Sequence, residues 1–142
     1  MSKILKIRAR QVFDSRGNPT IEAEVYSGNI SASAICPSGA STGTYEAFEK
    51  RDKNNQRYLG KSVLIAVNLV NTKISKKLKG TSIHDQTRID TILINLDGTR
   101  QKTNLGANAI LAVSMAAKKL SAKIKNVPLY KTFLVKNNYK LP

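Results

Sequence analysis

The first third of the chain alternates apolar and polar residues, which is the pattern of half-buried β-strands. Three segments show it, at residues 4–13, 20–26 and 30–36. The alternation is clearest in the second segment, where Ile21, Ala23 and Val25 lie between polar side chains. The short turn-forming sequence Ser27-Gly28-Asn29 joins the second segment to the third, so these two should form an antiparallel hairpin. We therefore expect a three-stranded antiparallel β-meander.

After Gly60 the apolar residues recur with the period of an α-helix. They form three stripes: Val63, Ala66, Val67, Val70 and Ile74; Ile89, Ile92, Leu93 and Leu96; and Ala109, Val113, Ala116, Leu120 and Ile124. We expect Thr81 or Ser82 to cap the second helix, Asp97-Gly98 to end it, and Pro128 to start a last short helix over 129–136. A meander followed by about four α-helices is an α+β fold.

The chain is strongly basic, with 24 Lys and Arg against 9 Asp and Glu, a formal net charge of +15. Such a field attracts nucleic acid and acidic partners. Lys118, Lys119, Lys123 and Lys125 lie along one helix pattern without interleaved aromatic residues, which favours a solvated face. An independent basic binding module, with only non-specific affinity for nucleic acid or an affinity for acidic partners, stays open as the alternative function.

The sequence gives no sign of a membrane or secreted protein. No stretch approaches the 18 apolar residues of a membrane span, and residues 1–10 lack the apolar centre of a signal peptide. The lone Cys36 agrees with a reducing compartment and is expected to be a small buried residue. We expect a cytoplasmic protein with no membrane contact.

Several catalytic classes are disfavoured by the residues themselves. Gly60-Lys61-Ser62 resembles the end of a phosphate-binding loop, but Asn55 stands where that loop needs its first glycine. His84 is the only histidine, so a histidine-pair metal site is excluded and a surface position near a helix start is expected. The nine acidic residues show no paired spacing typical of a Mg²⁺ site.

Four motifs occur in order at compatible spacings: DSRGNPT at 14–20, PSGASTG at 37–43, LDGT at 96–99 and LGANAIL at 105–111. Together they resemble the amino-terminal domain of enolases, and the resemblance covers essentially all 142 residues. It implies that residues 1–142 form one capping, or lid, domain with the α+β layout described above. It also implies that the catalytic barrel domain of enolases is absent from this chain.

The resemblance implies a function as part of a larger enzyme. Enolases are carbon-oxygen lyases of glycolysis that use Mg²⁺ to dehydrate 2-phosphoglycerate to phosphoenolpyruvate. Their base, their acid and the three carboxylate ligands of the tightly bound metal lie in the barrel. No catalytic residue is therefore expected in this chain, and the chain alone is expected to be inactive.

What the chain supplies, by resemblance, is a mobile active-site loop of six residues: Ser38, Gly39, Ala40, Ser41, Thr42 and Gly43. In that comparison Ser41 chelates the second Mg²⁺ through its hydroxyl and carbonyl oxygens, and the other five have positional roles. The chemistry agrees, because both oxygens are hard ligands and the two glycines permit unusual backbone angles. A flexible surface turn without a ligand is the alternative.

The resemblance also implies a homodimer in the full-length protein, with ion pairs from Arg10 and Glu22 to the partner's barrel. Ordinary exposed strand charges explain these two residues equally well. Three positions depart from the family pattern: Lys50 stands in place of an apolar residue, and Lys53 and Ser62 in place of glycines. These departures put local packing in question, not the family.

Overall fold

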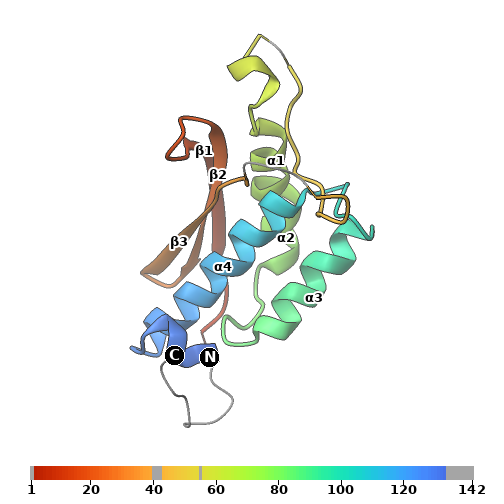
Figure 1. Ribbon diagram of the computed structural model, residues 1–142. Coiled ribbons are helices and arrows are strands. Elements are labelled where there is room, and N and C mark those ends of the chain that lie inside the picture. The colour runs from red at the N-terminus through yellow and green to blue at the C-terminus, as the bar shows by residue number, and fades with distance from the viewer. Residues whose placement is uncertain (1, 40–42, 55, 134–142) are drawn as a thin grey trace.

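The computed structural model describes residues 2–39, 43–54 and 56–133 and confirms the predicted meander (Figure 1). Strands β1 (Lys6–Phe13), β2 (Pro19–Ser27) and β3 (Ile30–Cys36) form one antiparallel sheet in the order β1-β2-β3. Gly28 and Asn29 alone connect β2 to β3, and Gly28 has a φ of +60°, which glycine adopts without steric cost.

The helices also follow the predicted stripes. Helix α1 (Leu64–Leu69), the π-helical turn η2 (Val70–Ile74) and α2 (Ser75–Leu78) run on without a break, and α3 (Gln86–Asp97) and α4 (Ala107–Ile124) come later. Two short 3₁₀ turns, η1 (Tyr58–Gly60) and η3 (Leu129–Phe133), complete the described elements. Helix α4 packs on β2 and β3, the α1–η2 segment packs on β1, and α3 packs against α4 (Figure 1). The fold is α+β, as predicted.

One face of the sheet and the inner faces of the helices form the core. Its largest fully buried side chains are Ile4, Ile21, Val25, Val63, Val70, Ile74, Leu78, Ile83, Ile89, Leu93, Leu105 and Leu120. The predicted alternation places Ile21, Ala23 and Val25 in this core with no exposed surface. Burial of these apolar side chains is the main force that holds the helices on the sheet.

Both edges of the sheet are covered by polar side chains from the helices. At the β1 edge the Asn71 amide accepts from the Ala9 N–H (2.7 Å) and donates to the Ala9 carbonyl (3.1 Å). At the β3 edge, Lys119 and Lys123 donate from their Nζ atoms to two outward carbonyls, those of Ser33 (3.3 Å) and Ser31 (3.0 Å). Lysines at an edge discourage pairing with another strand, so part of the basic face of α4 has a structural use.

The predicted start of α3 is corrected, and its predicted end is confirmed. Asp85 caps α3, accepting from the Arg88 N–H at 3.0 Å; neither Thr81 nor Ser82 does. The helix starts later because Ile83 is buried and its N–H donates to the Ser2 carbonyl, which holds the preceding residues in an extended connection. The end at Asp97-Gly98 is confirmed, with Gly98 in the left-handed conformation.

The first predicted strand and the last predicted helix also change. Ile4 lies before β1 because its N–H and carbonyl bond to Thr81 and Gly80. The last predicted helix is a 3₁₀ turn over 129–133, and its remaining residues, 134–136, lie outside the described part.

Candidate functional site

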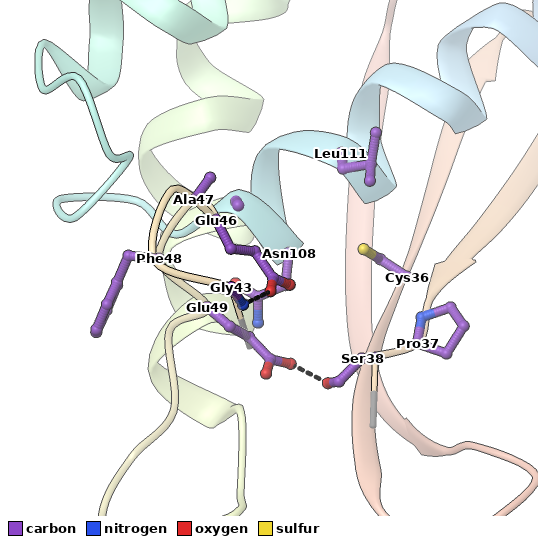
Figure 2. A pocket seen from close by; sticks show the side chains of 12 residues that line it. Cys36, Pro37, Ser38, Gly43, Glu46, Ala47, Phe48, Glu49, Asn108 and Leu111 are labelled. Carbon is purple, nitrogen blue, oxygen red and sulfur yellow. Dashed lines mark hydrogen bonds between the residues drawn. The ribbon is translucent and has the colours of Figure 1, made fainter. Parts of the chain in front are cut away.

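The predicted loop leaves β3 directly after Cys36, at the end of the sheet near the start of α4 (Figure 2). Ser38, Gly39 and Gly43 belong to the described residues. Ala40, Ser41 and Thr42 lie outside them, so the metal-ligand role of Ser41 stays a prediction. The structure therefore shows how the two ends of this loop are held.

The first end is held by Arg16 and Glu49. The Arg16 Nη2 atom donates to the carbonyls of Ser38 (2.8 Å) and Gly39 (3.3 Å), and the Ser38 hydroxyl donates to Glu49 Oε1 (Figure 2). Arg16 is itself placed by Asp14, whose Oδ1 accepts from the Arg16 N–H at 2.9 Å. The turn between β1 and β2 thus contacts the loop, so a residue of the DSRGNPT motif holds the start of the PSGASTG motif.

The guanidinium group of Arg51 completes this arrangement, because all three of its nitrogen atoms donate hydrogen bonds. Its Nε and Nη2 atoms donate to the two carboxylate oxygens of Glu49 at 3.1 and 2.9 Å, and Nη2 also donates to Ser38 Oγ at 2.7 Å. Nη1 donates to the carbonyls of Pro19 (3.2 Å) and Lys61. We call Ser38, Glu49 and Arg51 the loop clamp.

The second end of the loop closes in a tight turn. The Gly43 N–H donates to Glu46 Oε2 at 3.0 Å, and the Glu46 N–H donates to the Gly43 carbonyl at 3.1 Å (Figure 2). Reciprocal bonds of this kind fix a short turn without apolar packing. Carboxylates from the segment after the loop therefore hold both of its ends.

The opposite side of the same segment is fastened to the fold. The Phe48 N–H donates to the Gln101 carbonyl at 2.7 Å, and the Ala107 N–H donates to the Phe48 carbonyl at 2.8 Å. Asn108 accepts from the Lys50 N–H and donates to the Lys50 carbonyl, both at 3.1 Å. We call Phe48, Lys50, Gln101, Ala107 and Asn108 the fold anchor.

Gly106 makes this close approach of two chain segments feasible. A Cβ atom built there would lie 2.5 Å from the Lys50 Cβ and 2.6 Å from Asn108 Oδ1, and Gly106 has a φ of +94°. Both facts require glycine. The Lys50 ammonium donates to the carbonyls of Thr103 and Asn104 at 2.9 Å each, so the lysine in place of an apolar residue is accommodated.

Asp97, from the LDGT motif, organises the chain that leads to Gly106. Its side-chain oxygens accept from the backbone N–H groups of Thr99 (3.0 Å) and Leu105 (2.7 Å). Burial opposes ionisation, but these bonds and the Thr99 hydroxyl outweigh it and hold the Asp97 pKa below its usual value. Asp97 is 2% exposed, so it serves as a buried structural carboxylate.

A pocket of about 580 Å³ opens between the loop ends and the start of α4 (Figure 2). Most of its lining side chains are apolar, among them Pro37, Phe48 and Leu111, and Glu46 and Glu49 are its two carboxylates. No group of three or more His, Cys, Asp or Glu side chains that could hold a metal ion occurs in 2–39, 43–54 and 56–133.

The residues set aside by sequence analysis have structural roles. His84 is exposed near the start of α3, as predicted, and its Nδ1 lies 2.9 Å from Ser121 Oγ. Cys36 is buried, as predicted, and burial together with the Glu49 charge raises the pKa of its thiol. Ser62 is buried and donates its hydroxyl to Gln11 Oε1 at 2.8 Å.

Arg10 and Glu22 face each other across β1 and β2, with Arg10 Nε 2.6 Å from Glu22 Oε2. The pair lies on the polar face of the sheet, and its proposed contact with a second subunit stays a prediction. Within the described part of the chain, no helix is long and apolar enough to cross a membrane.

Sequence reasoning missed the roles of Arg16, Glu49 and Arg51. All three lie inside segments matched by resemblance, but apolar periodicity gives no weight to charged residues. The available signal was the spacing of Glu49 and Arg51, because residues two apart in an extended segment point to the same side.

These features define an α+β domain that holds both ends of a Ser- and Gly-rich loop beside a pocket. A family model described as the enolase N-terminal domain matches residues 4–133. The chain belongs to this family.

Individual relatives agree with this assignment. The chain is 92% identical over 142 residues to the enolase of Pelagibacter ubique (strain HTCC1062). It is 53% identical over 140 residues to the enolases of Methanosarcina mazei and Methanosarcina acetivorans. These matches cover 99–100% of this chain but only 33–34% of each relative. The chain thus spans about a third of the length of the curated relatives it matches.

Proposed function

We propose that this domain is the amino-terminal portion of an enolase, a cytoplasmic lyase that dehydrates 2-phosphoglycerate to phosphoenolpyruvate. The observation that carries the proposal is 92% identity over the whole chain to the first third of a protein named enolase. The fold supports it, because both ends of the Ser- and Gly-rich loop are fixed by side chains from separate elements.

In this proposal residues 1–142 are a capping domain, and a barrel domain supplies the base, the acid and the main metal site. Mg²⁺, when bound, stabilises negative charge that develops on the substrate. Ser41 would hold the second Mg²⁺ with its hydroxyl and carbonyl, which are ligands that this hard cation accepts. Ser38, Gly39 and Gly43 would set the position of the loop, and the loop would exclude water from the substrate.

The full-length protein is proposed to be a homodimer, with Arg10 and Glu22 at the contact. The alternative, an independent basic binding module, is not favoured by the comparisons, which match enolases over the whole chain. Two lysines of the basic face of α4, Lys119 and Lys123, donate to carbonyls at the β3 edge. Any nucleic-acid binding should then be electrostatic, independent of sequence, and weaker as salt rises.

The proposal is tested by Ser41→Ala in a protein that joins this domain to an enolase barrel. The variant should lose on the order of 10- to 1000-fold in kcat and need more Mg²⁺, because an interaction made mainly in the charge-bearing state lowers the barrier selectively. Phosphoenolpyruvate absorbance gives the rate. Ser75→Ala, on α2 and outside the loop, is the matched control and should keep full activity. A Ser41→Ala variant with an unchanged rate and Mg²⁺ profile would remove Ser41 from the reaction.

A further inference from the structure

We propose that Glu49 and Arg51 are positioning residues that fix Ser38 and thereby set the direction in which the chain leaves β3. The inference rests on the proposed function, because the reaction gives this position its use. Both side chains lie outside the loop, in the segment that follows it.

The geometry of Arg51 is that of a bridge between three parts of the chain. Its donors reach the carbonyl of Pro19 at the start of β2, the carbonyl of Lys61 before α1, and the hydroxyl of Ser38. Glu49 binds the same guanidinium with both carboxylate oxygens. A planar fork with five donors can make all these bonds at once, whereas a lysine ammonium is a single charge on a flexible stem.

The Ser38 hydroxyl is the point where both residues act together. It donates to Glu49 Oε1 and accepts from Arg51 Nη2, so both its proton and a lone pair are engaged. Arg16 holds the Ser38 carbonyl from the other side. Three charged side chains therefore converge on one small residue at the entrance to the loop, an arrangement that fixes its position more than packing of so small a side chain could.

A purely structural role for the clamp is the competing explanation. The side chains of Arg51 and Glu49 are 19% and 31% exposed, and ion pairs with access to water add little to stability. The fold anchor on the other side of the same segment already fastens it to α4 through Asn108 and Ala107. Loss of the clamp should therefore change the position of Ser38 more than it changes the stability of the fold.

The test uses Arg51→Lys, Ser38→Ala and the double variant in a protein that joins this domain to an enolase barrel. Arg51→Lys should lower kcat at least tenfold and raise the Mg²⁺ requirement, with KM for 2-phosphoglycerate within threefold of the parent. The double variant should be little worse than Arg51→Lys alone, because both changes remove the same contact. Arg88→Lys, on the exposed side of α3, is the matched control and should behave as the parent.

A second readout does not depend on the reaction. In NMR relaxation measurements on the 142-residue chain, the backbone order parameters should fall at Ser38 and Gly39 in Arg51→Lys, with those of α4 unchanged. Lower order parameters throughout the chain, or unchanged order parameters at Ser38, would overturn the proposal. Additive losses in the double variant would overturn the joint action on Ser38. A parent protein without turnover would contradict the proposed function, and the order parameters would still decide the positioning role.

Discussion

The loop clamp and the fold anchor occupy opposite sides of one short extended segment, residues 48–51. Glu49 and Arg51 point toward Ser38, whereas Phe48 and Lys50 bond through their backbones to the start of α4 and to the turn before it. Within the anchor Asn108 is buried, at 4% exposed, and the adjoining Gly106 is buried as well, whereas the clamp side chains of Arg51 and Glu49 are 19% and 31% exposed. Phe48 and Lys50 therefore fasten the segment to the fold, whereas Glu49 and Arg51 hold the start of the loop.

We therefore predict that substitutions on the anchor side lower the stability of the fold. Substitutions on the clamp side should mainly alter the position of Ser38. The burial of Asn108 and Gly106 is the physical reason. A lost bond to a buried group leaves a desolvated donor or acceptor, while water can replace a bond that is partly exposed.

The largest effect is expected at the anchor, for Gly106→Ala. The added Cβ would overlap the Lys50 Cβ and Asn108 Oδ1, and the residue would be forced into a left-handed conformation. Overpacking and strain together should lower the free energy of unfolding by about 3–4 kcal/mol. Urea denaturation of the 142-residue chain measures this free energy. Gly80→Ala is the control, since Gly80 also has a positive φ but open space around it, and it should lose only about 1 kcal/mol. Equal losses of stability in the two variants would disprove the close approach of Gly106 to Lys50.

Asn108→Ala should come next, with a loss of about 2 kcal/mol, because two bonds to the Lys50 backbone disappear in a buried place. Arg51→Lys is the matched change on the clamp side and should cost less than about 1 kcal/mol. Thermal melts of the two variants compare them directly. A greater loss of stability for Arg51→Lys than for Asn108→Ala would contradict the claim that the anchor contributes more to stability than the clamp.

The dependence of stability on pH tests the hydrogen-bonded carboxylates of the fold. Asp97 has its pKa lowered against the opposing effect of burial, and Asp14 and Glu24 have theirs lowered mainly by bonds from the Asn18 N–H and the Tyr26 hydroxyl. A lowered folded-state pKa stabilises the fold above the unfolded value of about 4. That stability is lost as the pH falls through the folded-state pKa values.

Urea denaturation between pH 7 and pH 3 should show this loss. Asp97→Asn should be less stable at pH 7 and should have a shallower slope at acid pH, because one of the titrating groups is gone. A parent chain whose stability stays constant down to pH 3 would contradict the role of these carboxylates.

The smallest effect is a gain in stability at Lys53, one of the positions that departs from the family pattern. Lys53 has a φ of +56°, a left-handed conformation that costs a side-chain-bearing residue about 1–2 kcal/mol. Because glycine also gains freedom in the unfolded chain, Lys53→Gly should raise the free energy of unfolding by only about 0.5–1 kcal/mol. Lys77→Gly within α2 should instead lower it by about 1 kcal/mol. A destabilised Lys53→Gly would mean that the lysine side chain has a packing role.

Much of this fold was predictable from sequence because apolar side chains repeat with the period of their element. Ile21, Ala23 and Val25 predicted β2, and the stripe from Ala109 to Leu120 predicted α4; both lie in the core. Asp85 was missed as a cap because Ser82 and Thr81 have equal intrinsic preference for that position, and only the burial of Ile83 decides between them.

The position of the candidate site was predictable from sequence, but the contacts that hold it together were not. The residues of PSGASTG predicted a loop, and Gly106 in LGANAIL was visible as a motif. That Lys50 is the neighbour that requires glycine at 106 depends on a contact between segments far apart in sequence. The same is true of the contact from Arg51 to Ser38, which no local pattern encodes.

The central claim is that this domain positions a loop for a reaction whose base, acid and main metal site lie in another domain. The most direct test measures phosphoenolpyruvate formation from 2-phosphoglycerate with excess Mg²⁺, by the 142-residue chain alone and by the same chain joined to an enolase barrel. The account predicts no turnover by the chain alone and turnover by the joined protein. Turnover by the chain alone within about tenfold of ~10 s⁻¹, a typical enzyme value, would contradict it.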